Sequence, residues 1–149
     1  MAITVSVYNH TTALFLDQSV DLNSLKLMLL DDSASFDATD AHVDDVSDSG
    51  GFEVDGGGWT TGGETLTSVG VTTVTTNDAM LDADDVDVTA TGGDIGPADA
   101  AVIYDATSGK PLAYIDFDSS ITAVEGTNFL VAWHDDGIFT LSYGGEETT

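Results

Sequence analysis

The sequence predicts an all-β, single-domain fold: an antiparallel β-sandwich or barrel with one or two short helices. Two observations support this prediction. Between Ala100 and Tyr143, short runs of β-branched, aromatic and aliphatic residues alternate with turn-forming residues, which indicates a meander of strands. About eight such runs, spaced about 8–12 residues apart, follow one another along the whole chain, as in sandwiches and barrels. The runs of the meander are 100–105, 112–117, 129–134 and 139–143.

The length and composition are those of one domain that can bury a core. The chain has 149 residues, of which 42% are apolar, and we expect a single domain over residues 1–149. Residues 144–149 form a polar tail, which we expect to be disordered.

The first half of the chain predicts strands and the helices. Ile3–Tyr8 alternates as a strand or extended arm, and Asn9–Leu16 can form one or two helical turns. Ser24–Leu30 predicts a strand with one fully buried face. Phe36–Ser49 predicts the main helix, capped by Thr39 or Asp37 and stopped by glycines.

The middle of the chain reads as short strands and glycine-rich loops. Phe52–Val54 is a short extended piece, and residues 55–63 form a glycine-rich loop around Trp59. Two further strands are expected at 79–82 and 86–91, after a turn at 77–78. Between the loop and that turn, residues 64–76 are rich in β-forming side chains, with Leu66, Val69, Val71 and Val74 as core candidates.

Charge is the strongest global feature. There are 27 acidic residues against two lysines, which gives a formal net charge of −25. We therefore expect no nucleic-acid partner, because nothing can neutralise phosphates, and no membrane partner, because an anionic surface would repel the chain. At about 1 M salt the Debye length falls to about 3 Å and the self-repulsion is screened. The composition favours a halophilic organism or a virus that infects one; the alternative is an acidic surface that docks on a basic partner.

No catalytic or cofactor-binding motif is evident, so the chain is predicted not to be an enzyme. His10, His42 and His134 fall in three different elements and show no zinc-binding spacing. No Gly-x-Ser-x-Gly nucleophile motif is present, and the glycine-rich loop lacks the residues of a phosphate cradle. The sequence has no cysteine and its N-terminus does not resemble a signal peptide.

The densest acidic cluster is a weak candidate for a cation site. Asp82, Asp84, Asp85 and Asp87 offer the oxygen ligands that Ca²⁺ or Mg²⁺ prefer, but their spacing does not match a Ca²⁺-binding loop of the EF-hand type. With so many acids in the chain, clusters arise by chance. The favoured interpretation is a solvated acidic face and no metal site.

Two stretches are candidate interfaces. Val5 and Val7 lie where an edge strand can pair with a neighbour. Trp59, with Thr60 and Thr61, is either an interface anchor or part of the local core, and the pattern does not decide between them. Trp133, within a continuous apolar strand, is predicted to be core.

Several stretches resemble a family of small virion structural proteins of tailed bacteriophages. The resemblance covers most of the chain, from about residue 5 to residue 143, and is strongest in the predicted meander. The family carries an aromatic-arginine strand before this region, where the chain has Gly93–Ala98 and no arginine. The stretches that carry the resemblance are Asp21-Leu22, Leu25–Leu29, Asp40–His42, Trp59–Leu66, Leu81–Val86, Ala101–Asp105, Lys110–Phe117, Gly126 with Phe129–Trp133, and Gly137-Ile138.

The resemblance implies a structural role and no catalytic residues. With the charge, it leads us to expect a capsid decoration or cement protein of a haloarchaeal tailed virus, located on the capsid surface of the virion. Its partners would be the major capsid protein, other virion proteins and further copies of itself, as a homo-trimer or other homo-oligomer. The alternatives are a neck, tail or head-fibre component, or a host-surface or glycan-binding module in which Trp59 and Tyr8 stack on sugars.

Overall fold

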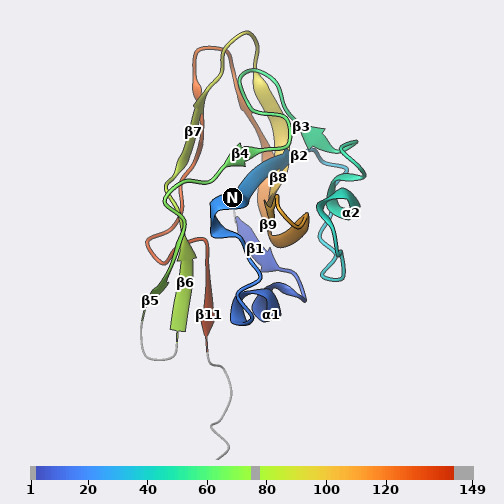
Figure 1. Cartoon of the computed structure of the whole chain (residues 1–149). Coiled ribbons are helices and arrows are strands. Elements are labelled where there is room, and N and C mark those ends of the chain that lie inside the picture. Colours follow the sequence, from blue (N-terminus) through green and yellow to red (C-terminus); the bar gives the residue numbers. More distant parts are fainter. Residues whose placement is uncertain (1–2, 75–77, 143–149) are drawn as a thin grey trace, which may run out of the picture.

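The computed structural model describes residues 3–74 and 78–142 (Figure 1). Antiparallel strands dominate it, which confirms the predicted all-β class. The strands are β1 (Thr4–Val7), β2 (Leu25–Leu30), β3 (Glu53–Val54), β4 (Glu64–Thr65), β5 (Gly70–Thr73), β6 (Asp78–Asp82), β7 (Val86–Thr89), β8 (Ile95–Asp105), β9 (Lys110–Ala123), β10 (Asn128–Val131) and β11 (Phe139–Ser142). The helices are α1 (Thr11–Leu16), α2 (Val43–Ser47) and a 3₁₀ turn at Leu22–Ser24.

The main sheet is built on the long β8–β9 hairpin. Its strand order is β1-β9-β8-β2-β3, and β4 also pairs with β2. The central strand β2 is buried on both sides, whereas the sequence predicted one buried face. Leu27 and Leu29 face one side of the sheet and Met28 and Leu30 the other, and all four are nearly inaccessible. Both faces of this sheet must therefore be covered.

Two small sheets and one helix provide that cover. The sheets β5-β6-β11 and β7-β10 form a second layer, seen along the left of Figure 1. Leu81, Val86 and Phe129 from this layer pack with Leu27 and Ile103 of the main sheet in the larger core. On the opposite face, α2 contributes Val43 and Val46 to a smaller core around Met28, Val102 and Tyr114. The result is a β-sandwich whose outer face carries a short helix.

The predicted meander is wrong beyond its first hairpin. β10 pairs with β7 and β11 pairs with β6, so both strands leave the main sheet after β9. On the outer side of β9, β1 pairs with residues 113–116, from the Thr4–Asp116 pair to the Val7–Ala113 pair. The chain after β9 contributes its strands to the second layer instead.

The predicted helix at 36–49 is also too long. Only α2 forms, with His42 as its N-cap: the imidazole Nδ1 accepts the Asp44 N–H at 3.1 Å, and the Asp45 carboxylate accepts the His42 N–H at 3.0 Å. Asp37 accepts the Thr39 N–H in a local turn and caps no helix. Short polar side chains compete with helical backbone bonds in this way.

Other element predictions have mixed outcomes. The helical turns expected near Ala13 exist as α1. Of the core candidates in 64–76, Leu66 is buried, whereas Val71 and Val74 are 52% and 40% exposed, so their assignment to the core was wrong. Asn77 and the tail 144–149 lie outside the described residues. No helix in the described part of the chain is long and apolar enough to cross a membrane.

Candidate functional site

Trp59 belongs to the core and is not available as an interface anchor. Its side chain is only 3% exposed, and its ring contacts Phe129 of β10 edge-on, with centroids 5.4 Å apart. The loop around it lies close against other backbone: the Thr91 N–H donates to the Gly57 carbonyl at 2.8 Å, and a Cβ on Gly57 would collide with the Asp94 carbonyl. The glycine-rich loop therefore joins the main sheet to the second layer.

The other two interface candidates of this loop, Thr60 and Thr61, are exposed, but no exposed aromatic side chain lies beside them in the loop. The Thr60 N–H donates to Glu64 Oε1 at 2.7 Å, and the Thr61 hydroxyl donates to Asp55 Oδ2 at 2.5 Å. Tyr8, the second aromatic residue expected to stack on sugars, is 1% exposed. Because Trp59 and Tyr8 are both buried, the glycan-binding interpretation loses the side chains on which it depended.

The acidic cluster at 82–87 is not gathered around a common point. Asp84 Oδ2 accepts the hydroxyls of Thr67 and Ser68 at 3.0 and 2.7 Å, and Asp85 Oδ1 accepts the Trp133 N–H at 2.9 Å. Asp87 is exposed on β7. Within residues 3–74 and 78–142, no three His, Asp or Glu side chains are placed to hold a metal ion.

Elsewhere too, hydroxyls and backbone N–H groups are the partners of the carboxylates. Asp21 accepts the hydroxyls of Ser24 and Thr107 and the Asn23 N–H, and these bonds lower the pKa of that carboxyl. Two carboxylates lie at ion-pair distance from a histidine, Asp44 from His42 and Asp136 from His134, each at 3.4 Å. A chain with two lysines stabilises its acids with serine and threonine instead.

The histidines do not come together. His10 Nε2 lies 2.6 Å from the Pro111 carbonyl, His42 caps α2, and His134 is exposed in the turn before β11. Trp133, predicted to be core, is half-buried at the margin of the larger core, and its indole N–H donates to the Asp84 carbonyl at 3.1 Å.

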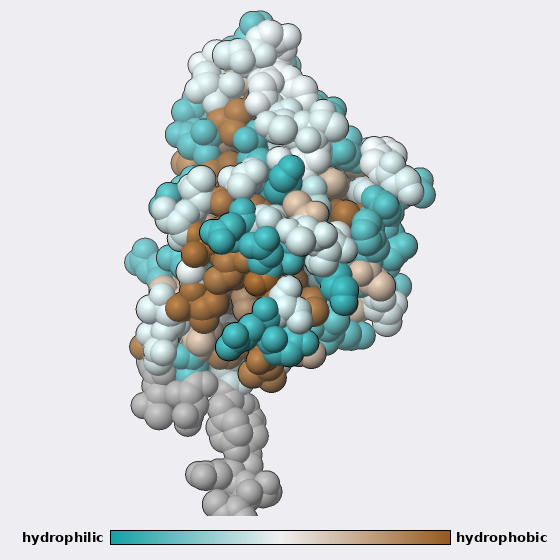
Figure 2. Space-filling view, in the orientation of Figure 1, coloured by the Kyte–Doolittle hydropathy of each residue, from teal (hydrophilic) through white to brown (hydrophobic). Residues whose placement is uncertain are grey.

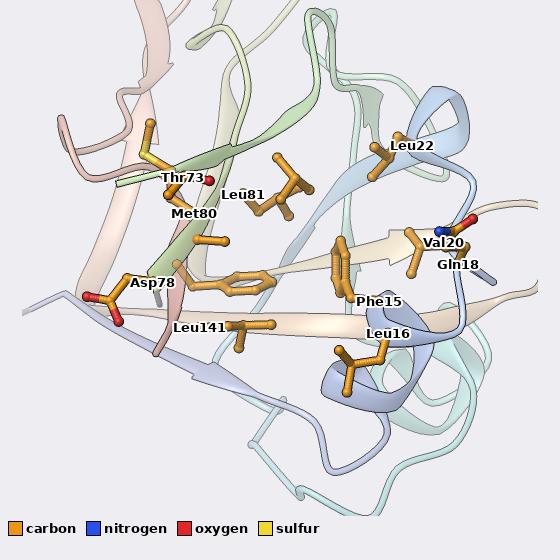
Figure 3. Close-up of a pocket in the computed structure, with 13 residues that line it drawn as sticks. Phe15, Leu16, Gln18, Val20, Leu22, Thr73, Asp78, Met80, Leu81 and Leu141 are labelled. Atoms are coloured by element: carbon orange, nitrogen blue, oxygen red, sulfur yellow. The ribbon is translucent and has the colours of Figure 1, made fainter. Parts of the chain in front are cut away.

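A first apolar groove lies between α1 and the sheet β5-β6-β11. This α1 groove has a volume of about 650 Å³. In Figure 3, Phe15 and Leu22 stand on one side of it and Met80, Leu81 and Leu141 on the other. The centroids of the Phe15 and Phe139 rings are 5.9 Å apart, with an interplanar angle of 81°, so the two walls are in contact. The remaining lining residues are Leu16, Gln18, Val20, Val71, Thr73, Asp78 and Ala79.

The rim of the α1 groove leaves apolar side chains in water. Leu16 is 79% exposed and Val71 is 52% exposed. Figure 2 shows hydrophobic surface gathered between the second layer and α1, bordered by hydrophilic side chains. An exposed apolar patch with a polar border is typical of an interaction site.

A second apolar groove follows the free edge of β1. This β1 groove, of about 560 Å³, lies where the open edges of the two layers approach each other. Ile3 and Val5 line one side and Leu130, Val131 and Trp133 the other, above the buried side chains Ile115, Phe117, Phe129 and Ile138. Val5 and Val7 are 38% and 36% exposed. The structure thus places the predicted interface residues Val5 and Val7 on an edge strand.

Comparison of the chain with known protein families, with curated proteins and with solved structures finds no match in any of the three.

The sequence pattern missed the α1 groove, and of the residues that line the β1 groove it indicated only Val5 as an interface residue. Each groove joins residues far apart in the chain, and the apolar periodicity of one element does not reveal its neighbours. For the α1 groove the available signal was Ala13–Leu16, where four consecutive apolar residues fall in a single short helix. Such a helix cannot bury all its sides against one core.

Proposed function

We propose that this protein is a structural component of a virus particle, a capsid decoration or cement protein that binds the major capsid shell. The observation that carries the proposal is the α1 groove: a wide apolar recess with an exposed rim on a chain of net charge −25. On such a surface, contacts with another protein concentrate where charge is absent. The resemblance to small virion proteins of tailed bacteriophages supports a capsid as that partner.

The proposed mechanism is the burial of apolar surface at the junctions of the shell. A segment of the major capsid protein would insert apolar side chains between Phe15 and Met80, against the walls supplied by α1 and β6. The acidic surface would face a solvent of high salt, where its self-repulsion is screened. Each bound copy would add contact area that opposes the internal pressure of the packaged DNA.

The first test is the location and the copy number of the protein in purified particles. Quantitative mass spectrometry against the major capsid protein should give a copy number in the hundreds, as expected for a component that covers a shell. A dozen copies or fewer would contradict the shell role and favour a neck, tail or head-fibre component. Absence from the particles would overturn the proposal altogether.

The second test addresses the groove itself. Leu16→Asp introduces a charge at a side chain that is 79% exposed, so the fold should tolerate it while docking is lost. Val124→Asp is the matched control, because Val124 is 55% exposed and lines neither groove. Reduced incorporation of both variants, or of neither, would contradict docking through the α1 groove.

A further inference from the structure

The outer edge of β1 offers unpaired backbone groups to a second strand. In the described chain β1 pairs only with β9, in a register that joins Ser6 to Tyr114. The Tyr8 N–H donates to the Leu112 carbonyl at 3.2 Å. Along an antiparallel strand, the backbone groups of successive residues point alternately toward one neighbouring strand and away from it. The N–H and C=O groups of Ser6 and Thr4 therefore also point toward β9. The N–H and C=O groups of Val5 and Val7 therefore point away from the sheet.

The side chains of the same residues present one apolar face. Successive side chains of a strand alternate between the two faces, so Ile3, Val5 and Val7 share a face. Val5 is paired with Ile115, whose side chain belongs to the larger core. Ile3 is 58% exposed, and Leu130, across the β1 groove, is 57% exposed. The edge thus combines outward backbone groups with an apolar groove that reaches the core.

The edge lacks the features by which proteins prevent strand addition. Residues 3–16 contain no Asp, Glu, Lys or Arg, although the chain has 27 acidic residues. β1 contains no proline, and its register with β9 is uninterrupted. Exposed edges are commonly protected by a lysine, a proline or a bulge. An unprotected, uncharged edge on so acidic a chain indicates that the edge is covered.

We propose that β1 pairs antiparallel with β1 of a second copy, which joins the two main sheets into one. A twofold axis at Val5 would pair Val5 with Val5 of the second copy and Ile3 with Val7 of the second copy, so all three apolar side chains gain a partner. A basic partner would bind to the acidic surface. Two copies of this chain, each with a net charge of −25, repel each other least where the surface carries no charge. This inference does not rest on the proposed function.

The oligomeric state in solution is the direct test. Sedimentation equilibrium in molar NaCl should give a dimer that dissociates as the salt is lowered, because repulsion between the copies grows. Val5→Lys should be monomeric at the same concentrations with an unchanged circular dichroism spectrum. Val124→Lys, also at an exposed valine but outside the β1 groove, should remain a dimer. A monomeric or trimeric wild type, or a dimeric Val5→Lys variant, would overturn the proposal.

Disulfide cross-linking tests the register and does not depend on how Val5→Lys folds. The chain has no cysteine, so a single introduced cysteine can bond only to its counterpart in another copy. Directly hydrogen-bonded residues of antiparallel strands have Cα atoms about 5.5 Å apart, within the range of a disulfide. Val5→Cys should therefore form a covalent dimer on mild oxidation and Val124→Cys should not. Equal cross-linking of both variants, or of neither, would contradict the paired edge. A solution dimer that is absent from virus particles would leave this inference intact and remove the proposed function.

Discussion

The indole ring of Trp59 lies edge-on against the phenyl ring of Phe129, with the ring centroids 5.4 Å apart. This contact joins the glycine-rich loop to β10, and so connects the main sheet to the second layer. Phe129 is 3% exposed and forms part of the floor of the β1 groove. The tryptophan that looked like a binding residue therefore supports one of the grooves from within.

Trp59→Ala should destabilise the fold strongly. Removal of a buried aromatic side chain costs about 3–5 kcal/mol, through lost burial and the cavity that remains. Urea unfolding should show this loss in the free energy of unfolding. Trp59→Phe, which keeps a ring against Phe129 and removes a buried indole N–H that has no hydrogen-bond partner in the described structure, should cost markedly less. Equal losses in both variants would contradict this account.

Asp105→Ala should destabilise the fold even though the chain has an excess of acids. Asp105 is 2% exposed; its Oδ2 accepts the Asp21 N–H and its Oδ1 the Thr107 N–H, both at 2.9 Å. Loss of both acceptors leaves two N–H groups without a partner and costs about 2–4 kcal/mol. Asp87→Ala, at an exposed carboxylate, should change the free energy of unfolding by less than about 0.5 kcal/mol. Thermal unfolding of the two variants side by side measures the difference.

The stability should fall above about pH 10, the ordinary pKa of tyrosine. Burial, with the nearby carboxylates of Asp116 and Asp99, raises the pKa of Tyr114 to about 12. Between these values the unfolded chain loses the phenol proton that the folded chain retains, so the free energy of unfolding decreases as the pH rises. Urea midpoints between pH 8 and pH 12 should decline less in Tyr114→Phe than in the wild type. Parallel declines would show that Tyr114 does not contribute.

Low salt should destabilise the isolated protein. The Debye length grows from about 3 Å at 1 M to about 10 Å at 0.1 M salt, so repulsion among the carboxylates increases as salt is removed. We expect circular dichroism to report loosened structure below about 0.5 M NaCl. A variant in which the exposed residues Asp32, Asp87 and Asp135 are replaced by Asn should withstand lower salt. A spectrum that stays constant down to low salt would remove the argument for a high-salt environment.

Local sequence patterns determined the fold class and much of the strand content of this protein. The alternation in Thr4–Val7, Leu25–Leu30 and Val86–Thr89 predicts strands because it reflects a property of each segment alone: which side chains can face a core. The charge balance likewise follows from composition. The helix at 36–49 was overestimated, because aspartate side chains in that stretch bond to local backbone N–H groups and leave only α2 helical.

Only the tertiary structure decided which strands pair and which side chains remain exposed. β1 and β9 are separated by more than 100 residues, yet their pairing makes β1 the edge of the main sheet and leaves Val5 on that free edge. Trp59 became core because Phe129 lies beside it, and Leu16 remained exposed because the chain around α1 forms a groove there. Contacts between distant segments depend on the whole fold, so no local pattern encodes them.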